Sequence, residues 1–259
     1  MLKTVKWVSI GLGSIILLIV LFFAWYMIKA KAEINLMTPT ESKVIDNNIL
    51  SVHDSFTNLY LVKDSSQYLA IDAGNSPETV SAELKKLSVD PSKITALLLT
   101  HSDADHVAAI SLFKNAKFFL SKQEEQMVNG KTSRFLFFGN KIDAREYSTI
   151  DDQQVITIGH LKIKGILTPG HTPGSMCYLV NDKYLFTGDA LSLKNGKIAK
   201  FNEFFNMDTN TAVQSIANIT QIPEAEYLFT AHYGYSDDYK NSVKDWNKDV
   251  PMPAKVPNK

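Results

Sequence analysis

The sequence contains very little cysteine and no excess of charge of either sign. Among its 259 residues, Cys177 is the only cysteine, so an internal disulfide is excluded and cysteine usage does not identify the redox compartment. The 27 basic and 27 acidic residues balance, which gives no electrostatic reason to expect a nucleic-acid partner. There is also no internal repeat or low-complexity tract. The length suits one sizeable globular domain, or at most two small ones.

Charge is missing altogether from residues 7–28. A helix of this length spans roughly 33 Å, which is about the thickness of the hydrocarbon core of a membrane. Trp7, Trp25 and Tyr26 lie near its two ends, where aromatic residues of membrane helices gather. The sequence therefore predicts a single transmembrane helix, with residues 1–32 forming a membrane anchor and its flank.

The charges on the two sides of this stretch predict its orientation only weakly. Lys3 and Lys6 precede it, whereas Lys29 and Lys31 follow it and are partly offset by Glu33. This bias favours a cytoplasmic N-terminus and an extracytoplasmic domain. A cleaved secretory signal is the alternative, because an Ala-Lys-Ala sequence follows the apolar stretch, although signal peptides have a shorter apolar region of roughly 7–15 residues.

The remainder of the chain divides by composition into three parts. Residues 33–47 are predicted to be a linker, residues 48–235 a globular domain and residues 236–259 a polar tail. Short runs rich in β-branched and aromatic residues dominate the domain and predict strands. They cover residues 49–54, 57–63, 67–74, 118–121, 154–159, 161–168, 175–180, 184–188 and 226–231.

Two helices and one buried strand complete the expected fold. Residues 76–87 predict a helix that Ser76 caps and Pro77 begins, and residues 208–220 predict another, capped by Asp208. The continuous apolar run at residues 93–100 is typical of a strand buried on both faces. We expect an α/β fold built as a helix–sheet–sheet–helix sandwich.

Four of the six histidines lie where these apolar runs end. His101 and His106 follow the run at residues 93–100, and His171 and His232 each follow a later one. Asp189 likewise follows an apolar run, at residues 184–188. Loops at the ends of strands commonly carry chemistry, and histidine and aspartate are ligands of zinc and iron.

Four short sequences at these positions resemble the metal motifs of the metallo-β-lactamase superfamily. They are THSDADH, TPGHTPGS, FTGDAL and TAHYG, in the order of that superfamily, and NLYLV followed by YLAIDAG is similar to its opening strands. The likeness covers about residues 48 to 235. It implies a four-layer αββα sandwich and a metal-dependent hydrolase, similar to glyoxalase II or a lactonase.

The resemblance also implies a role for each site residue. The first metal would be held by His101, Asp103 and His171. The second would be held by Asp105, His106 and His232. Asp189 would bridge the two metals, and Asp105 and Asp189 would orient a hydroxide between them. Asp72 would orient the ligand loop from behind. The expected cofactor is a pair of divalent ions, zinc first, and the expected partner is a small-molecule substrate.

Asp103 departs from the family pattern, which has histidine there. A carboxylate is still a competent zinc ligand, and we expect Asp103 to bind the metal. Two divalent ions, three aspartates and a hydroxide sum to zero formal charge, one unit less than the histidine version. This should raise the pKa of the bridging water and favour harder metals such as iron or manganese. The opposing hypothesis is that the first metal site has been lost.

The substrate is predicted only as an ester, lactone, thioester or amide. Phenylalanines at 135, 137, 138, 201, 204 and 205 would either line an apolar wall or pack as a satellite of the core. An iron-dependent oxidoreductase and a catalytically silent, membrane-tethered binding domain are the alternative functions. His53 and His160 match no motif and are predicted to be structural, and Cys177 is predicted to be a small buried hydrophobic residue.

Overall fold

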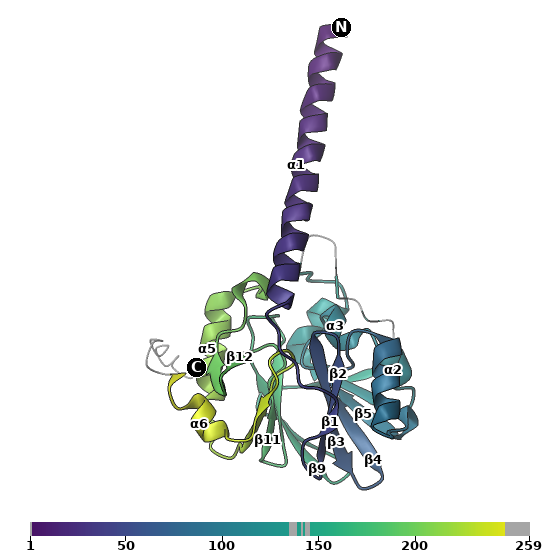
Figure 1. Ribbon diagram of the computed structural model, residues 1–259, viewed down its shortest axis with the longest axis vertical. Helices are drawn as coiled ribbons and strands as arrows, with labels where there is room; N and C mark the ends of the chain where they lie inside the picture. The colour runs from purple at the N-terminus through teal and green to yellow at the C-terminus, as the bar shows by residue number, and fades with distance from the viewer. Residues whose placement is uncertain (1, 135–138, 141, 143–145, 247–259) are drawn as a thin grey trace. The chain divides into compact units, whose positions relative to one another are not determined.

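The computed structural model describes residues 2–134, 139–140, 142 and 146–246. The chain divides between Met37 and Thr38 into two compact units. The first unit contains helix α1 (Leu2–Ile34), drawn in purple in Figure 1. Its segment Leu12–Ile34 has a mean hydropathy of 2.2 and is long and apolar enough to cross a membrane, a test that a signal sequence also passes.

The second unit contains two large β-sheets. The first has seven strands in sequence order. They are β1 (Lys43–Val44), β2 (Ile49–Asp54), β3 (Thr57–Asp64), β4 (Gln67–Ile71), β5 (Ile94–Leu98), β6 (Lys117–Ser121) and β7 (Tyr147–Ile150). Strands β1 to β4 pair antiparallel and β4 to β7 pair parallel. The continuous apolar run thus became β5, which lies between two parallel neighbours.

The second sheet has six strands in the order β15-β14-β11-β10-β9-β8. They are β8 (Val155–Ile158), β9 (Leu161–Leu167), β10 (Met176–Val180), β11 (Tyr184–Phe186), β14 (Tyr227–Phe229) and β15 (Tyr235–Ser236). Only β11 and β14 pair parallel. Strands β12 (Ser192–Lys194) and β13 (Lys197–Ala199) form a separate hairpin.

The helices begin where their capping residues predict. Helix α2 (Pro77–Lys86) has Ser76 as its cap, whose hydroxyl accepts from the Thr79 N–H at 3.2 Å. Helix α5 (Thr209–Ile219) is capped by Asp208 in the same way. The remaining helices and 3-10 turns are short: α3 (Ala104–Val107), α4 (Glu125–Val128), α6 (Tyr239–Val243), η1 (Pro91–Lys93), η2 (Ile110–Leu112), η3 (Lys122–Glu124) and η4 (Glu203–Phe205).

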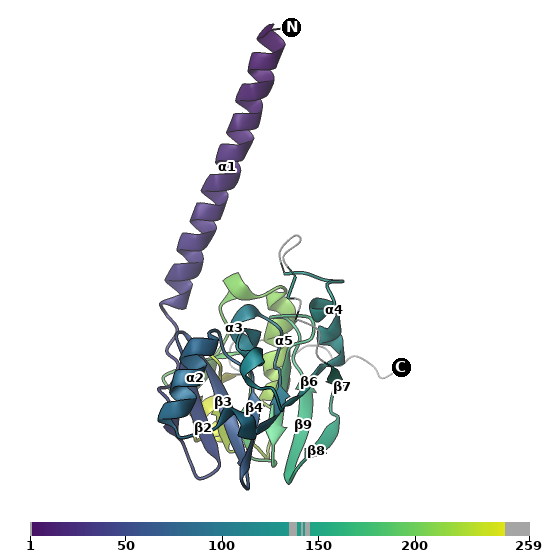
Figure 2. The ribbon, with the colours of Figure 1, turned by 90° about the vertical axis from the view of Figure 1, so that its right-hand side faces the viewer.

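Alternation along the strands sorts side chains into three apolar layers. In β3, Leu59 and Leu61 pack toward the α2 side, whereas Tyr60 and Val62 face the space between the two sheets. A third cluster joins the outer face of the second sheet to α5, including Ile216. Helices therefore cover the outer face of each sheet (Figures 1 and 2). The predicted α/β sandwich of four layers is confirmed.

The segments predicted as linker and polar tail carry regular structure close to the sheets. Strand β1 pairs with β2, and the Asn58 side chain exchanges two hydrogen bonds of 2.7 Å with the Thr40 backbone. In α6, Tyr239 is buried and its hydroxyl donates to the carbonyl of Ile219 at 2.5 Å. Residues 247–259 of the predicted tail lie outside the described part of the chain.

Candidate metal centre

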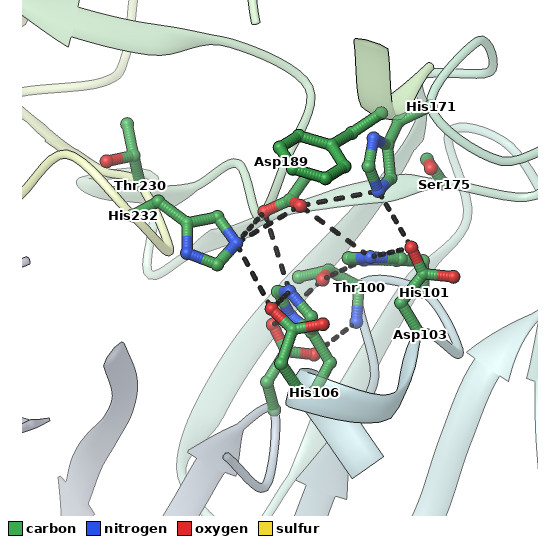
Figure 3. Close-up of polar contacts among 12 residues, drawn as sticks. Thr100, His101, Asp103, His106, His171, Ser175, Asp189, Thr230 and His232 are labelled. Atoms are coloured by element: carbon green, nitrogen blue, oxygen red, sulfur yellow. Dashed lines mark hydrogen bonds and ion pairs between the residues drawn. The ribbon is translucent and has the colours of Figure 1, made fainter. Parts of the chain in front are cut away.

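The predicted ligands meet where strands of the two sheets end. Asp72 follows β4, His101 lies in the loop after β5, Asp189 follows β11 and His232 follows β14. Because β4 and β5 are parallel neighbours, as are β11 and β14, each pair presents its carboxyl ends at one edge of its sheet. In Figure 3, four histidines and Asp189 turn toward one another.

The two aspartates of the predicted ligand loop lie on either side of the start of helix α3, and their carboxylates lie near different histidines. Asp103 precedes the helix with extended backbone, and its Oδ2 lies 3.1 Å from His171 Nε2 and 3.5 Å from His101 Nε2. Asp105 lies inside the helix, and its Oδ2 lies 3.4 Å from His106 Nε2 and 3.3 Å from His232 Nε2. One short loop thus supplies ligands to two separate groups.

The potential ligand atoms form three overlapping groups. Within each, the ligand atoms lie within 4.8 Å of one another; the groups are His101–Asp103–His171, Asp105–His106–His232 and His101–His106–Asp189. Asp189 contacts histidines of both groups, and both of its oxygens lie close to His232, with Oδ2 3.2 Å from His232 Nε2. Its Oδ1 lies 3.1 Å from His232 Nε2, and its Oδ2 lies 3.3 Å from His171 Nε2. Asp189 therefore stands between the groups predicted to hold the first and second metals.

All four histidines engage Nδ1 outside the centre and turn Nε2 inward. The Nδ1 partners are Thr100 Oγ1 for His101 at 3.1 Å, Asp72 Oδ2 for His106 at 2.9 Å, Asn206 Oδ1 for His171 at 3.3 Å and the Phe56 carbonyl for His232 at 2.7 Å. Such contacts fix the ring orientation and tautomer of metal-binding histidines. Asp72, predicted to orient the loop, also accepts from the Thr100 N–H and hydroxyl, each at 2.8 Å.

Three buried atoms at the centre make no well-aligned hydrogen bond in the described structure, although charged groups lie close to each. They are His101 Nε2, His106 Nε2 and Asp189 Oδ1. Buried polar atoms normally find partners, because leaving them unpaired costs free energy. A divalent ion would satisfy all three, since neutral imidazole nitrogen and carboxylate oxygen are its usual ligands. The donor set therefore fits bound metal.

The carboxylates of the centre are held in their charged form. Burial alone would raise the pKa of Asp189, but the nearby charges of His232, His106 and His171 hold it well below its ordinary value. Burial would likewise lower the pKa of His106, yet Asp105, Asp189 and Asp72 raise it well above its ordinary value of 6.5. In the metal-free chain, protonated histidine thus offsets part of the negative charge, and metal binding would release protons.

Two further polar residues contact Asp103, and neither was among the site residues predicted from the sequence. Arg134 places Nε 3.1 Å from Asp103 Oδ1 and Nη2 2.5 Å from Asp103 Oδ2. The Asn140 side chain donates to Asp103 Oδ1 at 2.6 Å. Burial would raise the pKa of Asp103, but His101, His171 and the charge of Arg134 hold it well below its ordinary value.

Glu124 is a third residue that the sequence did not single out. It is 1% exposed. Its Oε1 accepts from the Ser102 N–H at 2.9 Å and the Ser102 hydroxyl at 2.6 Å. Its Oε2 accepts from the Thr172 hydroxyl at 2.7 Å and the Gly174 N–H at 3.1 Å. Glu124 therefore joins the loop that carries His101 to the loop that carries His171.

The described phenylalanines near the centre differ in their burial. Phe201 is 3% exposed, and its ring lies edge-on to His171 with centroids 5.0 Å apart. Phe204 and Phe205 are half-buried and contact each other. The predicted wall residues at 135, 137 and 138 lie outside the described part of the chain. Phe201 therefore packs against the ring of the candidate metal ligand His171.

The residues predicted to be structural lie outside the three groups. His160 pairs with Asp64, with Nδ1 and Oδ1 2.8 Å apart. His53 lies half-buried in β2. Cys177 is fully buried, as predicted, and burial raises the pKa of its thiol to about 12.

The family follows from residues 54–232, which match the model of the metallo-beta-lactamase superfamily. This range contains the whole set of predicted ligands, from His101 to His232. The chain therefore belongs to the metallo-β-lactamase superfamily.

Several curated proteins resemble the chain in sequence. The probable polyketide biosynthesis zinc-dependent hydrolase BaeB of Bacillus velezensis is 30% identical over 151 residues, which are 56% of this chain and 60% of that protein. The hydroxyacylglutathione hydrolase of Buchnera aphidicola is 30% identical over 174 residues, 66% of this chain and 60% of that protein. The chain spans 54% of a related Bacillus subtilis hydrolase and 63% of a Methanocaldococcus jannaschii probable metallo-hydrolase.

Solved structures resemble the chain in fold at low identity. A subclass B3 metallo-β-lactamase described as the first with an active-site glutamic acid superposes with a TM-score of 0.62 at 18% identity, covering 81% of this chain and 87% of that one. A family protein from Thermus thermophilus superposes with a TM-score of 0.59 at 15% identity, covering 78% and 79%. At these identities the likeness concerns the fold.

Proposed function

We propose that this chain is a metal-dependent hydrolase with a dinuclear centre. His101, Asp103 and His171 would hold one ion, Asp105, His106 and His232 the other, and Asp189 would bridge them. The observation that carries the proposal is the common orientation of the four histidines. Each engages Nδ1 elsewhere and turns Nε2 toward Asp189. Zinc is the first candidate ion, and iron or manganese would also suit a centre with three carboxylates.

When bound, such ions polarise a scissile carbonyl and lower the pKa of a shared water so that hydroxide forms near neutral pH. The side chains of the protein would orient the nucleophile and the histidine rings. The carboxylates of Asp105 and Asp189 would accept hydrogen bonds from the nucleophile and fix its direction of attack. Asp72 would hold the His106 ring in place through Nδ1. No serine or cysteine nucleophile is required, in keeping with the fully buried Cys177.

The substrate class that we propose is a small molecule with an ester, lactone, thioester or amide carbonyl. The named relatives support this choice, since one is a hydrolase of polyketide biosynthesis and another cleaves a glutathione thioester by its name. The mononuclear form of the iron-dependent oxidoreductase is disfavoured, because both groups of candidate ligands are present in full. The alternative is a catalytically silent binding domain, and a measurement of turnover distinguishes it from an enzyme.

Metal content and hydrolysis test the function together. The full chain in detergent, His106→Ala and His160→Ala would be compared for bound metal by elemental analysis and for turnover of a panel of esters, lactones, thioesters and β-lactams. His160 is the matched control, because it is exposed and pairs only with Asp64 among the carboxylates of the described chain. We expect chelator-sensitive turnover by the native chain and His160→Ala, and loss in His106→Ala. Metal without turnover would favour the binding domain, and iron with oxygen consumption the oxidoreductase.

We also propose that α1 anchors the protein in the membrane with its hydrolase domain outside the cytoplasm. The length and hydropathy of Leu12–Ile34 support a span, and the N-terminal lysines support the orientation. Membrane fractionation followed by external protease treatment tests this. An anchored domain stays with the membrane pellet and is digested from outside, whereas a cleaved signal would release a shortened, soluble domain.

A further inference from the structure

One group of predicted ligands already contains a cation from the protein itself. The guanidinium of Arg134 donates to both oxygens of Asp103. Its Nη2 also lies 3.1 Å from His171 Nε2. It therefore contacts two of the three residues that would bind the first metal ion.

The atoms that Arg134 contacts are those that the first ion would need. Arginine carries hydrogen-bond donors only, so its contact with His171 Nε2 places a donor at the nitrogen that a metal would use, beside Asp103 Oδ2 at 3.1 Å from the same nitrogen. The Nδ1 of His171 faces Asn206 Oδ1 at 3.3 Å, which suits a proton on Nδ1 and a free lone pair on Nε2. The guanidinium and a metal ion therefore exclude each other from this position.

Additional contacts hold Arg134 in place. Its Nη1 donates to the Phe205 carbonyl, and its Nη2 donates to the His171 carbonyl at 3.2 Å. Planar, forked contacts of this kind distinguish arginine from lysine. Withdrawal of the side chain would thus break several hydrogen bonds in addition to the ion pair with Asp103.

The second group shows no such competitor in the part of the chain that the structure describes. There, the cationic partners of Asp105 are the histidines of its own group, His106 and His232. Asp105 and Asp103 stand two residues apart in one loop, yet among the described residues only Asp103 meets an arginine. The two groups are therefore unequal before any metal arrives.

We propose that Arg134 competes with metal for the first position and makes loading sequential. The first ion enters at Asp105, His106 and His232. The position at His101, Asp103 and His171 fills only when Arg134 is displaced, so the singly loaded protein is the stable species at low metal concentration. This inference rests on the proposed metal centre and adds an order of occupancy to it. Arg134 also explains why a carboxylate at position 103 is useful, since histidine could not form the same ion pair.

Stepwise zinc binding to the full chain in detergent tests the proposal. The metal-free native chain, Arg134→Ala and Lys131→Ala would be titrated with zinc against a competing chelator, with stoichiometry checked by elemental analysis. Lys131→Ala is the matched control, because it removes an exposed positive charge three positions away. Losing charge-assisted hydrogen bonds to Asp103 should tighten the second binding step about tenfold to hundredfold in Arg134→Ala. The first step and the Lys131→Ala titration should match the native chain.

A second variant tests the proposal independently, in case Arg134→Ala does not fold. In Asp103→His, Arg134 loses its carboxylate partner while the ligand group gains an imidazole, so the second step should again tighten. Thermal unfolding of each metal-free variant shows whether it folds. Equal second-step affinities in all folded variants would overturn the proposal and leave the dinuclear centre in place, whereas only one ion bound by every variant would overturn both the order of occupancy and the dinuclear centre. No zinc bound by any variant would instead remove the proposed function itself.

Discussion

Glu124 offers the most decisive test of how the two ligand loops are held together. It is a buried carboxylate whose four hydrogen bonds join Ser102 to Thr172 and Gly174. Each of its oxygens accepts from one backbone N–H. In Glu124→Gln, one of the two N–H groups must face the amide nitrogen whichever way the amide is turned. Glutamine at this position therefore cannot accept from both backbone N–H groups.

The cost follows from these contacts. An unsatisfied buried donor and a lost charge-assisted bond should together lower the free energy of unfolding by about 2–5 kcal/mol. The loops of His101 and His171 should separate, which weakens metal binding as well. Glu125→Gln is the control, because Glu125 is only half-buried and accepts a hydrogen bond from the exposed Tyr147 hydroxyl at 3.1 Å. Such a surface change usually stays within about 0.5 kcal/mol.

Denaturant unfolding of the metal-free and zinc-saturated chains measures this difference. We expect Glu124→Gln to unfold at lower denaturant in both states, with Glu125→Gln close to the native chain. The metal-free measurement does not depend on the proposed activity. If Glu124→Gln were as stable as Glu125→Gln and bound zinc as tightly, the role of Glu124 in joining the loops would be refuted.

Three further outcomes are expected. Asp72→Asn should lower zinc affinity about 10- to 100-fold by loosening the His106 ring, whereas Asp64→Asn, which faces only the exposed His160 in a similar contact, should not; a competition titration compares them. Cys177 should resist a thiol-reactive dye in the folded chain, since burial raises its pKa to about 12, and should react fully in denaturant; rapid labelling of the folded chain would contradict its burial. The raised pKa of His106 means that its pairing with carboxylates stabilises the metal-free chain fully below its ordinary value of 6.5 and is lost as the pH rises through the folded-state value. Metal-free stability should thus fall on the alkaline side, and His106→Ala should flatten that fall; an equal fall in both chains would refute the assignment.

Local signals predicted the elements well where one segment decides its own structure. Ser76 and Pro77 placed the start of α2, and Asp208 placed the start of α5. The apolar run at residues 93–100 predicted a buried strand, which is β5. Strands β1, β7, β12, β13 and β15 were not predicted, because short strands with polar residues take their shape from their neighbours.

The candidate site shows the same division. The motifs at residues 101–106, 171, 189 and 232 were enough to name every predicted ligand, and all of them meet in the structure. Arg134 and Glu124 were not predicted. They lie 31 and 22 positions from their partners Asp103 and Ser102, and no spacing rule connects residues that meet only after the sheets have formed.

The sequence by itself determined the kinds of ligand and the order in which the chain presents them. Caps, strand patterns and strand-end histidines are local, so they can be recognised without knowing what lies opposite. Only the tertiary structure decided which charges meet: that Asp103 faces a guanidinium, that Asp105 faces histidines, and that one buried glutamate joins two loops. Electrostatic pairing depends on distances of a few ångströms between segments far apart in the chain, and packing alone sets those distances.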